Sequence, residues 1–155
     1  MNILKLTDAT IASVPNDSVA TLIQKCKAWG MQSQPFQDSV SGGDFPSFDC
    51  GYHFKFNTDE GQVSFFEILE KDDAIMQAGF QVLFPPALFA SKSKGCFERL
   101  SRQLTVYYGT GTPMKAGPAF LMNFKGSESV GYVSRLDTLS RNVVTIRIGN
   151  MDFWS

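Results

Sequence analysis

Residues 47–57 read SFDCGYHFKFN and alternate apolar and polar side chains along their whole length. In a pleated strand, successive side chains point to opposite faces of the sheet. The apolar members would therefore share one face; they are Phe48, Cys50, Tyr52, Phe54 and Phe56. The segment predicts a strand in a sheet that has one apolar face and one polar face.

Further strands are expected on the C-terminal side of this segment. Residues 57–61 (NTDEG) have the length and the glycine of a hairpin connection. Beyond it, strand patterns cover residues 62–70, 75–84, 119–125, 130–136 and 142–149. Residues 2–6 are assigned as a short edge strand. The sequence thus predicts about six long strands, mostly antiparallel.

Two helices are predicted, each ending at a glycine. Residues 17–29 place Val19, Leu22 and Cys26 on one helical face before Gly30, and residues 93–108 form a similar stripe before Gly109. Residues 31–46 and 110–118 are assigned as loops. The expected order is helix, three strands, helix, three strands, which is an α+β fold with the helices packed on one face of the sheet.

Length and composition favour a single domain over residues 1–155. The chain has 155 residues, of which 43% are hydrophobic, and no apolar run approaches the roughly 18 residues of a membrane-spanning helix. The first residues lack the pattern of a secretory signal. The odd number of cysteines, 3, favours free and buried thiols in a reducing compartment, so a cytoplasmic location is expected.

Charge is divided unevenly along the chain. Residues 1–90 carry a net charge of −6, whereas residues 91–155 carry +5 and contain every arginine. This division predicts an acidic zone and a basic zone on the folded surface. The acidic zone would contain Asp49, Asp59, Glu60, Glu67 and Glu70, and the basic zone Arg135, Arg141 and Arg147.

Four stretches resemble ligand-binding motifs only superficially. The glycine-rich residues 109–115 follow a helix and precede a strand, the reverse of a phosphate-binding loop. The aromatic residues 51–56 lack the basic position of an RNA-binding strand. The acidic pairs Asp59–Glu60 and Asp72–Asp73 lack the spacing of a calcium loop. We therefore expect no nucleic acid, metal or cofactor.

His53 is the one histidine of the chain and would lie on the polar face of its strand, beside Asp49 and Lys55. A histidine near carboxylates can act as a general acid or base, but no motif supplies a nucleophile next to it. The sequence therefore favours a protein without catalytic activity. A small enzyme or small-ligand-binding domain with a pocket near His53 remains the alternative.

These observations favour a binding protein that acts through protein–protein interaction, with a partner that is a basic protein and no membrane contact. Small acidic proteins without catalytic residues include bacterial immunity proteins, which are inhibitors of toxins, and chaperones for secreted effectors; this chain is similar to them in size and acidity alone. The predicted partner-binding residues are Asp44, Asp49, His53, Lys55, Asp59 and Glu60. The terminal Phe153 and Trp154 are expected to pack back on the sheet.

Overall fold

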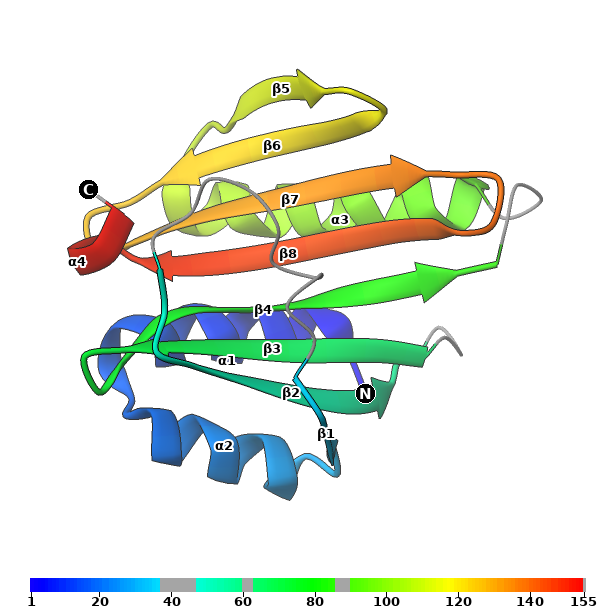
Figure 1. Cartoon of the computed structure of the whole chain (residues 1–155). Coiled ribbons are helices and arrows are strands. Elements are labelled where there is room, and N and C mark those ends of the chain that lie inside the picture. The colour runs from blue at the N-terminus through cyan, green and yellow to red at the C-terminus, as the bar shows by residue number, and fades with distance from the viewer. Residues whose placement is uncertain (37–46, 60–62, 86–89, 155) are drawn as a thin grey trace.

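The computed structural model describes residues 1–36, 47–59, 63–85 and 90–154 (Figure 1). The elements are, in chain order, α1 (Ile3–Asn16), α2 (Val19–Ala28), β1 (Gln32–Gln34), β2 (Cys50–Asn57), β3 (Val63–Lys71), β4 (Ala74–Phe84), α3 (Ala90–Tyr108), β5 (Thr112–Ala116), β6 (Ala119–Lys125), β7 (Ser129–Asp137), β8 (Asn142–Asn150) and α4 (Met151–Trp154).

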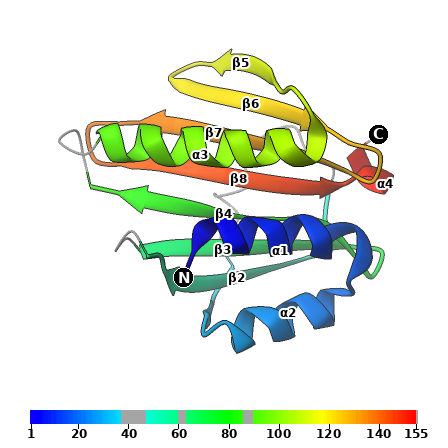
Figure 2. The same cartoon turned by 180° about the vertical axis from the view of Figure 1, so that it is seen from behind.

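All eight strands form one antiparallel sheet in the order β1-β2-β3-β4-β8-β7-β6-β5. The order is symmetric about the central β4–β8 pair. The four strands of the first half form one side of the sheet, with β1 at the edge, and the four strands of the second half form the other side, with β5 at the edge. Helices α1, α2 and α3 lie on one face, here called the helix side; the other face is called the far side (Figure 2). The α+β class and the antiparallel sheet are confirmed.

The predicted number of about six strands is too low, because both edge strands escaped the pattern. β1 consists of three polar residues, and β5 contains Pro113 and Lys115 without apolar alternation. β5 lies inside residues 110–118, which were assigned as a loop. Edge strands need no buried face, so they carry little of the signal by which a strand is recognised.

The prediction of an edge strand at residues 2–6 is wrong, because this segment begins helix α1. The side chain of Asn2 caps the helix by accepting hydrogen bonds from the backbone N–H groups of Leu4 (2.9 Å) and Lys5 (3.1 Å). The predicted helices are confirmed as α2 and α3, which start within three residues of the expected positions. The expected order of two helices with three strands each is replaced by two halves with four strands each.

The main core lies between the sheet and the helices. The alternation of β2 is confirmed, since Phe54 and Phe56 are buried on the helix side, whereas His53 and Lys55 alternate with them. Central strands β4 and β8 contribute Phe80 and Ile146, which face each other in the register. The other core residues include Leu6, Leu22, Cys26, Phe66, Cys96, Leu100, Leu104 and Ile148.

Cys26, Cys50 and Cys96 are all free, as predicted, but only Cys26 and Cys96 are buried. The expectation that Cys50 is buried is wrong. Cys50 is the first residue of β2 and lies opposite Glu70, at the end of this strand pair. Among the described helices, none combines the length and the apolar character that crossing a membrane requires.

Candidate functional site

The predicted partner-binding residues do not form one surface. Asp49 precedes β2 and Asp59 follows it, so an extended strand of about 3.3 Å per residue places them roughly 30 Å apart. Lys55 lies between them and is exposed. Asp44 and Glu60 fall outside the described residues.

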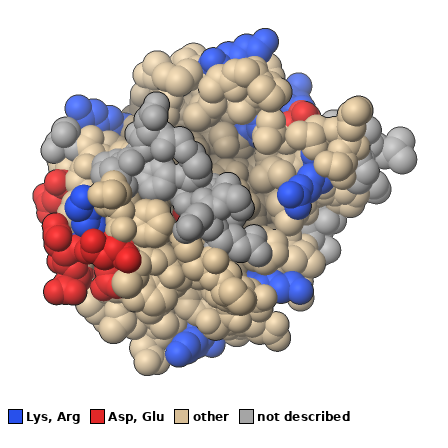
Figure 3. Space-filling model, viewed as in Figure 1, with Lys and Arg blue, Asp and Glu red and all other residues tan. Residues whose placement is uncertain are grey.

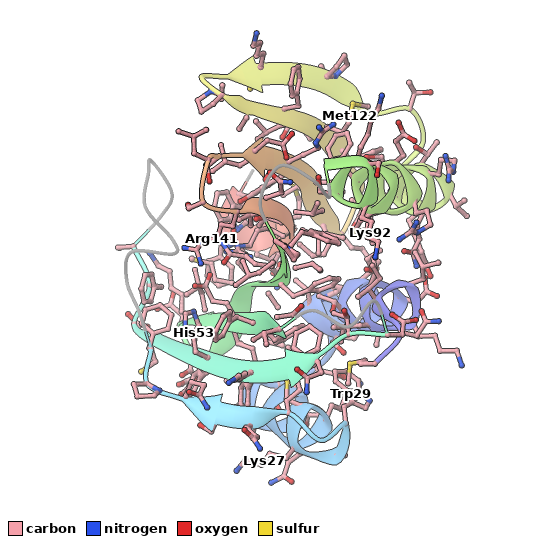
Figure 4. All side chains as sticks on the ribbon, turned by 90° about the vertical axis from the view of Figure 1, so that its right-hand side faces the viewer. Lys27, Trp29, His53, Lys92, Met122 and Arg141 are labelled. Atoms are coloured by element: carbon pink, nitrogen blue, oxygen red, sulfur yellow. The ribbon has the colours of Figure 1, made fainter. Side chains whose placement is uncertain are left out.

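His53 belongs to a row of three ionisable side chains on the far side of the sheet, here called the charge row: His53 in β2, Glu67 in β3 and Arg147 in β8. The Nε2 atom of His53 lies 3.1 Å from one carboxylate oxygen of Glu67, and the Nε atom of Arg147 lies 3.7 Å from the other. Figure 4 shows His53 on the side of the sheet away from the helices.

Gly79 of β4 allows Glu67 of β3 to reach Arg147 of β8, although β4 lies between these two strands. In the register, Glu67 faces Gly79 and Gly79 faces Arg147, so β4 places no side chain between the two charges. A Cβ atom at position 79 would lie 2.0 Å from the carbonyl oxygen of Ile146, so glycine is required there. The pairing of Glu67 with Arg147 therefore depends on the close contact of the two halves at β4 and β8.

The charge row is sealed from solvent. His53, Glu67 and Arg147 are 4%, 2% and 3% exposed. The expectation that Glu67 and Arg147 lie in charged surface zones is therefore wrong. His53 is buried rather than exposed on the polar face, while its part in partner binding stays a prediction. Alternation identifies the face on which a residue lies, but it does not reveal whether that face is exposed.

Neighbouring rings complete the surroundings of the charge row. The ring of Phe36 lies 4.8 Å from that of His53, centroid to centroid, and Tyr132 faces Arg147 in the register. Burial raises the pKa of Tyr132, and Arg147 partly opposes this shift. Paired charges in such a setting are a structural link, and removal of one partner would strand the other in the interior.

Among the described residues, the charge row pairs the histidine with a carboxylate, since the Nε2 atom of His53 lies 3.1 Å from Glu67. No group of three or more His, Cys, Asp or Glu side chains that could hold a metal ion occurs among the described residues.

A polar cavity of about 540 Å³ touches His53 on the far side. It extends over β4, β8 and β7 and reaches Arg141 in the turn between β7 and β8. Its other polar residues include Gln81, Ser134, Thr138 and Thr145. This cavity is the place where the small-ligand alternative would apply.

Acidic side chains gather at the turn between β3 and β4, here called the acidic corner: Asp49, Glu70, Asp72 and Asp73 (Figure 3). Asp72 and Asp73 adopt positive φ angles of 50° and 61°. The backbone N–H of Asp72 donates a hydrogen bond of 3.0 Å to a carboxylate oxygen of Asp49, which holds the turn. Of the predicted partner-binding residues, only Asp49 belongs to this cluster.

A largely apolar hollow lies on the helix side, between the first half of α3 and the β5–β6 hairpin, and is here called the hairpin groove. Its volume is about 570 Å³. Phe120 is 51% exposed, an unusual value for a large apolar side chain, and its strand also contributes Met122 to this face of the hairpin. The remaining lining residues are Lys94, Phe97, Glu98, Pro113, Lys115, Leu121, Met122 and Arg135.

Cationic side chains predominate around the hairpin groove. Lys94, Lys115 and Arg135 line it, against one acid, Glu98. The Nζ atom of Lys115 lies 5.6 Å from the centroid of the Phe120 ring. Lys115 and Phe120 are opposite each other in the β5–β6 register, so their side chains share one face. Arg135 also pairs with Asp137 at 2.5 Å.

Sequence reasoning missed the hairpin groove, because it assigned residues 110–118, which contain β5, as a loop. The number of predicted helices could have indicated such a groove. Two helices cannot cover one whole face of a broad sheet, so part of the apolar face should remain exposed.

The C-terminal residues pack back on the sheet. The indole N–H of Trp154 donates a hydrogen bond of 3.1 Å to the carbonyl oxygen of Met76, and the Trp154 ring lies against Gly149. The expectation for Trp154 is therefore confirmed.

No protein-family model matches the chain, and neither the curated proteins nor the solved structures with which it was compared provide a match.

Proposed function

We propose that this protein acts without catalysis, by binding another protein, and that the hairpin groove is the contact surface. The observation that carries the proposal is the half-exposed ring of Phe120, in a hollow of about 570 Å³ that Phe97 and Met122 also line. Contiguous apolar surface that remains open in a folded chain is typical of interaction sites.

The anatomy of the hairpin groove supports protein binding. Phe120, Phe97 and Met122 supply an apolar centre, and charged side chains stand around it. An apolar centre with a polar rim is the usual arrangement of a protein interface, and aromatic residues and methionine are enriched there.

The proposal that the protein is not an enzyme rests on the state of its one histidine. His53 is buried, its Nε2 atom faces Glu67, and Arg147 neutralises the same carboxylate. These contacts account for His53 as part of a structural link between strands.

An inhibitor of the immunity-protein type, directed at a basic toxin, would use a different surface. Asp49 and the rest of the acidic corner present several carboxylates at one turn (Figure 3). Opposite charge would speed association with a basic partner. The hairpin groove and the acidic corner therefore make opposite predictions about the charge of the partner.

Site-specific photo-cross-linking separates these two surfaces. A photoreactive phenylalanine analogue is placed at position 120 in the groove, at position 49 in the acidic corner, or at Leu139, whose side chain is 99% exposed. We expect a specific cross-linked protein in native cells from position 120 but not from position 139. Capture from position 49 alone would favour the acidic corner and contradict the groove proposal.

The polar cavity beside His53 supports a second candidate function, the binding of a small polar ligand. Gln81, Thr145 and Arg141 provide hydrogen-bond donors around a volume of about 540 Å³. Thermal-shift screening of polar metabolites with the native protein and with Gln81→Leu would test it. Stabilisation that Gln81→Leu abolishes would favour this function.

A further inference from the structure

The two halves of the chain repeat the same plan, with one omission. Helix α1 is followed by α2 and then by β1–β4, whereas α3 leads directly to β5–β8. In the symmetric strand order, β1 and β2 occupy the same places at one edge as β5 and β6 at the other. The second half therefore lacks a counterpart of α2.

In the first half, α2 contributes to the core beside β2. Val19, Leu22 and Cys26 are buried, and they belong to the same core cluster as Phe54 and Phe56 of β2. Figure 2 shows α2 at the β1–β2 edge of the sheet, on the helix side. Its spacing of three and four residues between apolar positions is that of one helical face.

In the second half, the corresponding place is open. Among the described helices, α3 lies over part of β6 but none lies over β5 at the sheet edge (Figure 2). All five residues of β5 are exposed, and Phe120 of β6 is 51% exposed. The hairpin groove lies there, between these strands and α3. Figure 4 shows Met122, one of its lining residues, next to α3.

The charge around the hairpin groove indicates which kind of partner helix would bind there. Lys94 and Lys115 are exposed at its rim against one acid, Glu98, whereas the charge of Arg135 is compensated by its pairing with Asp137. A helix with glutamate or aspartate beside its apolar stripe would complement this rim, whereas a lysine-rich helix such as α2 would be repelled.

Two other occupants fit less well. An added β-strand would need backbone donors along β5, but Pro113 has no N–H group and Lys115 stands on the same edge strand, and both features discourage strand pairing. A second copy of the chain, docked through the same groove, would bring two positive rims together.

We infer that the hairpin groove binds an acidic amphipathic helix of a partner protein, which takes the place that α2 has in the first half. This inference rests on the proposed function and specifies the partner class for the same surface. Helix-in-groove recognition of this kind uses apolar anchors at spacings of three and four residues.

The probe is a fluorescein-labelled synthetic helix of about 18 residues, five turns long, with leucines on one face and glutamates flanking them. The matched probe carries lysine in place of every glutamate. Fluorescence anisotropy with the full chain should show the acidic helix binding at least about tenfold more tightly than the basic one. This preference should shrink as salt rises, because the rim charges are screened.

Three variants test the groove itself. Phe120→Asp should weaken binding of the acidic helix by about tenfold or more, because it removes the central aromatic anchor. Lys94→Glu combined with Lys115→Glu should reverse the preference between the two helices. Leu139→Asp, which changes an apolar residue that is 99% exposed and outside the groove, should leave binding unchanged.

Several results would overturn the inference. These are equal binding of both helices, no binding of the acidic helix, or binding that Phe120→Asp does not weaken. Self-association or binding to phosphatidylserine vesicles that Phe120→Asp abolishes, without helix binding, would assign the groove to another occupant. If position 120 still cross-links a cellular protein in any of these cases, the proposed function stands and only the helical nature of the partner fails.

Discussion

The two edges of the sheet differ in how their apolar side chains are covered. At the β1–β2 edge, helix α2 packs beside β2 and Phe54 and Phe56 are buried, whereas at the β6–β5 edge Phe120 is half exposed. In β2 and in β6 alike, large apolar residues recur at every second position, with Phe54 and Phe56 in β2 and Phe120, Met122 and Phe124 in β6. The comparison shows that the pattern of a strand specifies which residues face the helix side. Whether those residues are buried in the core depends on whether a helix covers them.

The centre of the molecule, by contrast, joins the two halves tightly. Phe80 of β4 and Ile146 of β8 face each other on the helix side, and Glu67 and Arg147 meet across Gly79 on the far side. We therefore expect the centre and the β1–β2 edge to govern stability, and the β6–β5 edge to govern binding.

The largest expected difference is between the same substitution at the two edges. Phe56→Ala removes a buried ring that contacts Phe80 edge to face at 6.1 Å, and should cost about 3–5 kcal/mol in the free energy of unfolding. Phe120→Ala should change it by less than about 0.5 kcal/mol. Urea unfolding of both variants measures these values, and equal losses would contradict the comparison.

Breaking the charge row should weaken the junction between the halves. Glu67→Ala leaves Arg147 buried without its partner and should cost about 3–5 kcal/mol, whereas Glu67→Leu combined with Arg147→Met should recover most of this loss. Glu128→Ala, at an exposed position, is the control and should lie within about 0.5 kcal/mol of the native chain. A Glu67→Ala variant as stable as the control would exclude the structural role.

The reactivity of the Cys26 thiol tests whether α2 stays packed at its edge of the sheet. Burial raises the pKa of the Cys26 thiol in α2 to about 12, so little of the reactive thiolate exists at pH 8. Cys50 is exposed and should react first with a disulfide reagent, while Cys26 and Cys96 should react only after denaturation. Rapid reaction of Cys26 in the native protein would show that α2 does not stay packed, and the contrast between the edges would fail.

The smallest expected effect concerns the junction between α1 and α2. Lys25 donates a hydrogen bond of 2.6 Å to Asp17, and this bond lowers the pKa of Asp17 below its usual value. Because the pair is partly exposed, Asp17→Asn should lower the free energy of unfolding by only about 0.2–1 kcal/mol at pH 7. Because the folded pKa is the lower one, this contribution is present above about pH 4 and is lost as pH falls further. An Asp17→Asn loss that persists unchanged at pH 2 would contradict the pairing.

Much of the sheet was predictable from local pattern, because strands that bury one face must alternate. Phe54 and Phe56 in β2 show this, as do the strands after Pro118. Helix α1 was missed because Thr7 and Thr10, which are poor helix formers, interrupt its apolar stripe; in the fold their hydroxyl groups donate to the carbonyl oxygens of Ile3 and Leu6.

The candidate site depended on information that no local pattern contains. Glu67 and Arg147 are far apart in the sequence, and their contact follows from the β3–β4–β8 register and from the absence of a side chain at Gly79. The hairpin groove likewise follows from the missing counterpart of α2 and from the pairing of β5 with β6. Topology, and not composition, determines both features.

Methionine methyl resonances test the central claim most directly, because the 6 methionines are distributed over both halves. Met114 and Met122 line the hairpin groove, whereas Met31 and Met76 are buried elsewhere. On titration of the methyl-labelled chain with the acidic helix, we predict the largest shift at Met122, which shares a face with Phe120, and none at Met31 or Met76. Shifts confined to the methionines outside the groove, or no shifts at saturating helix, would contradict the account.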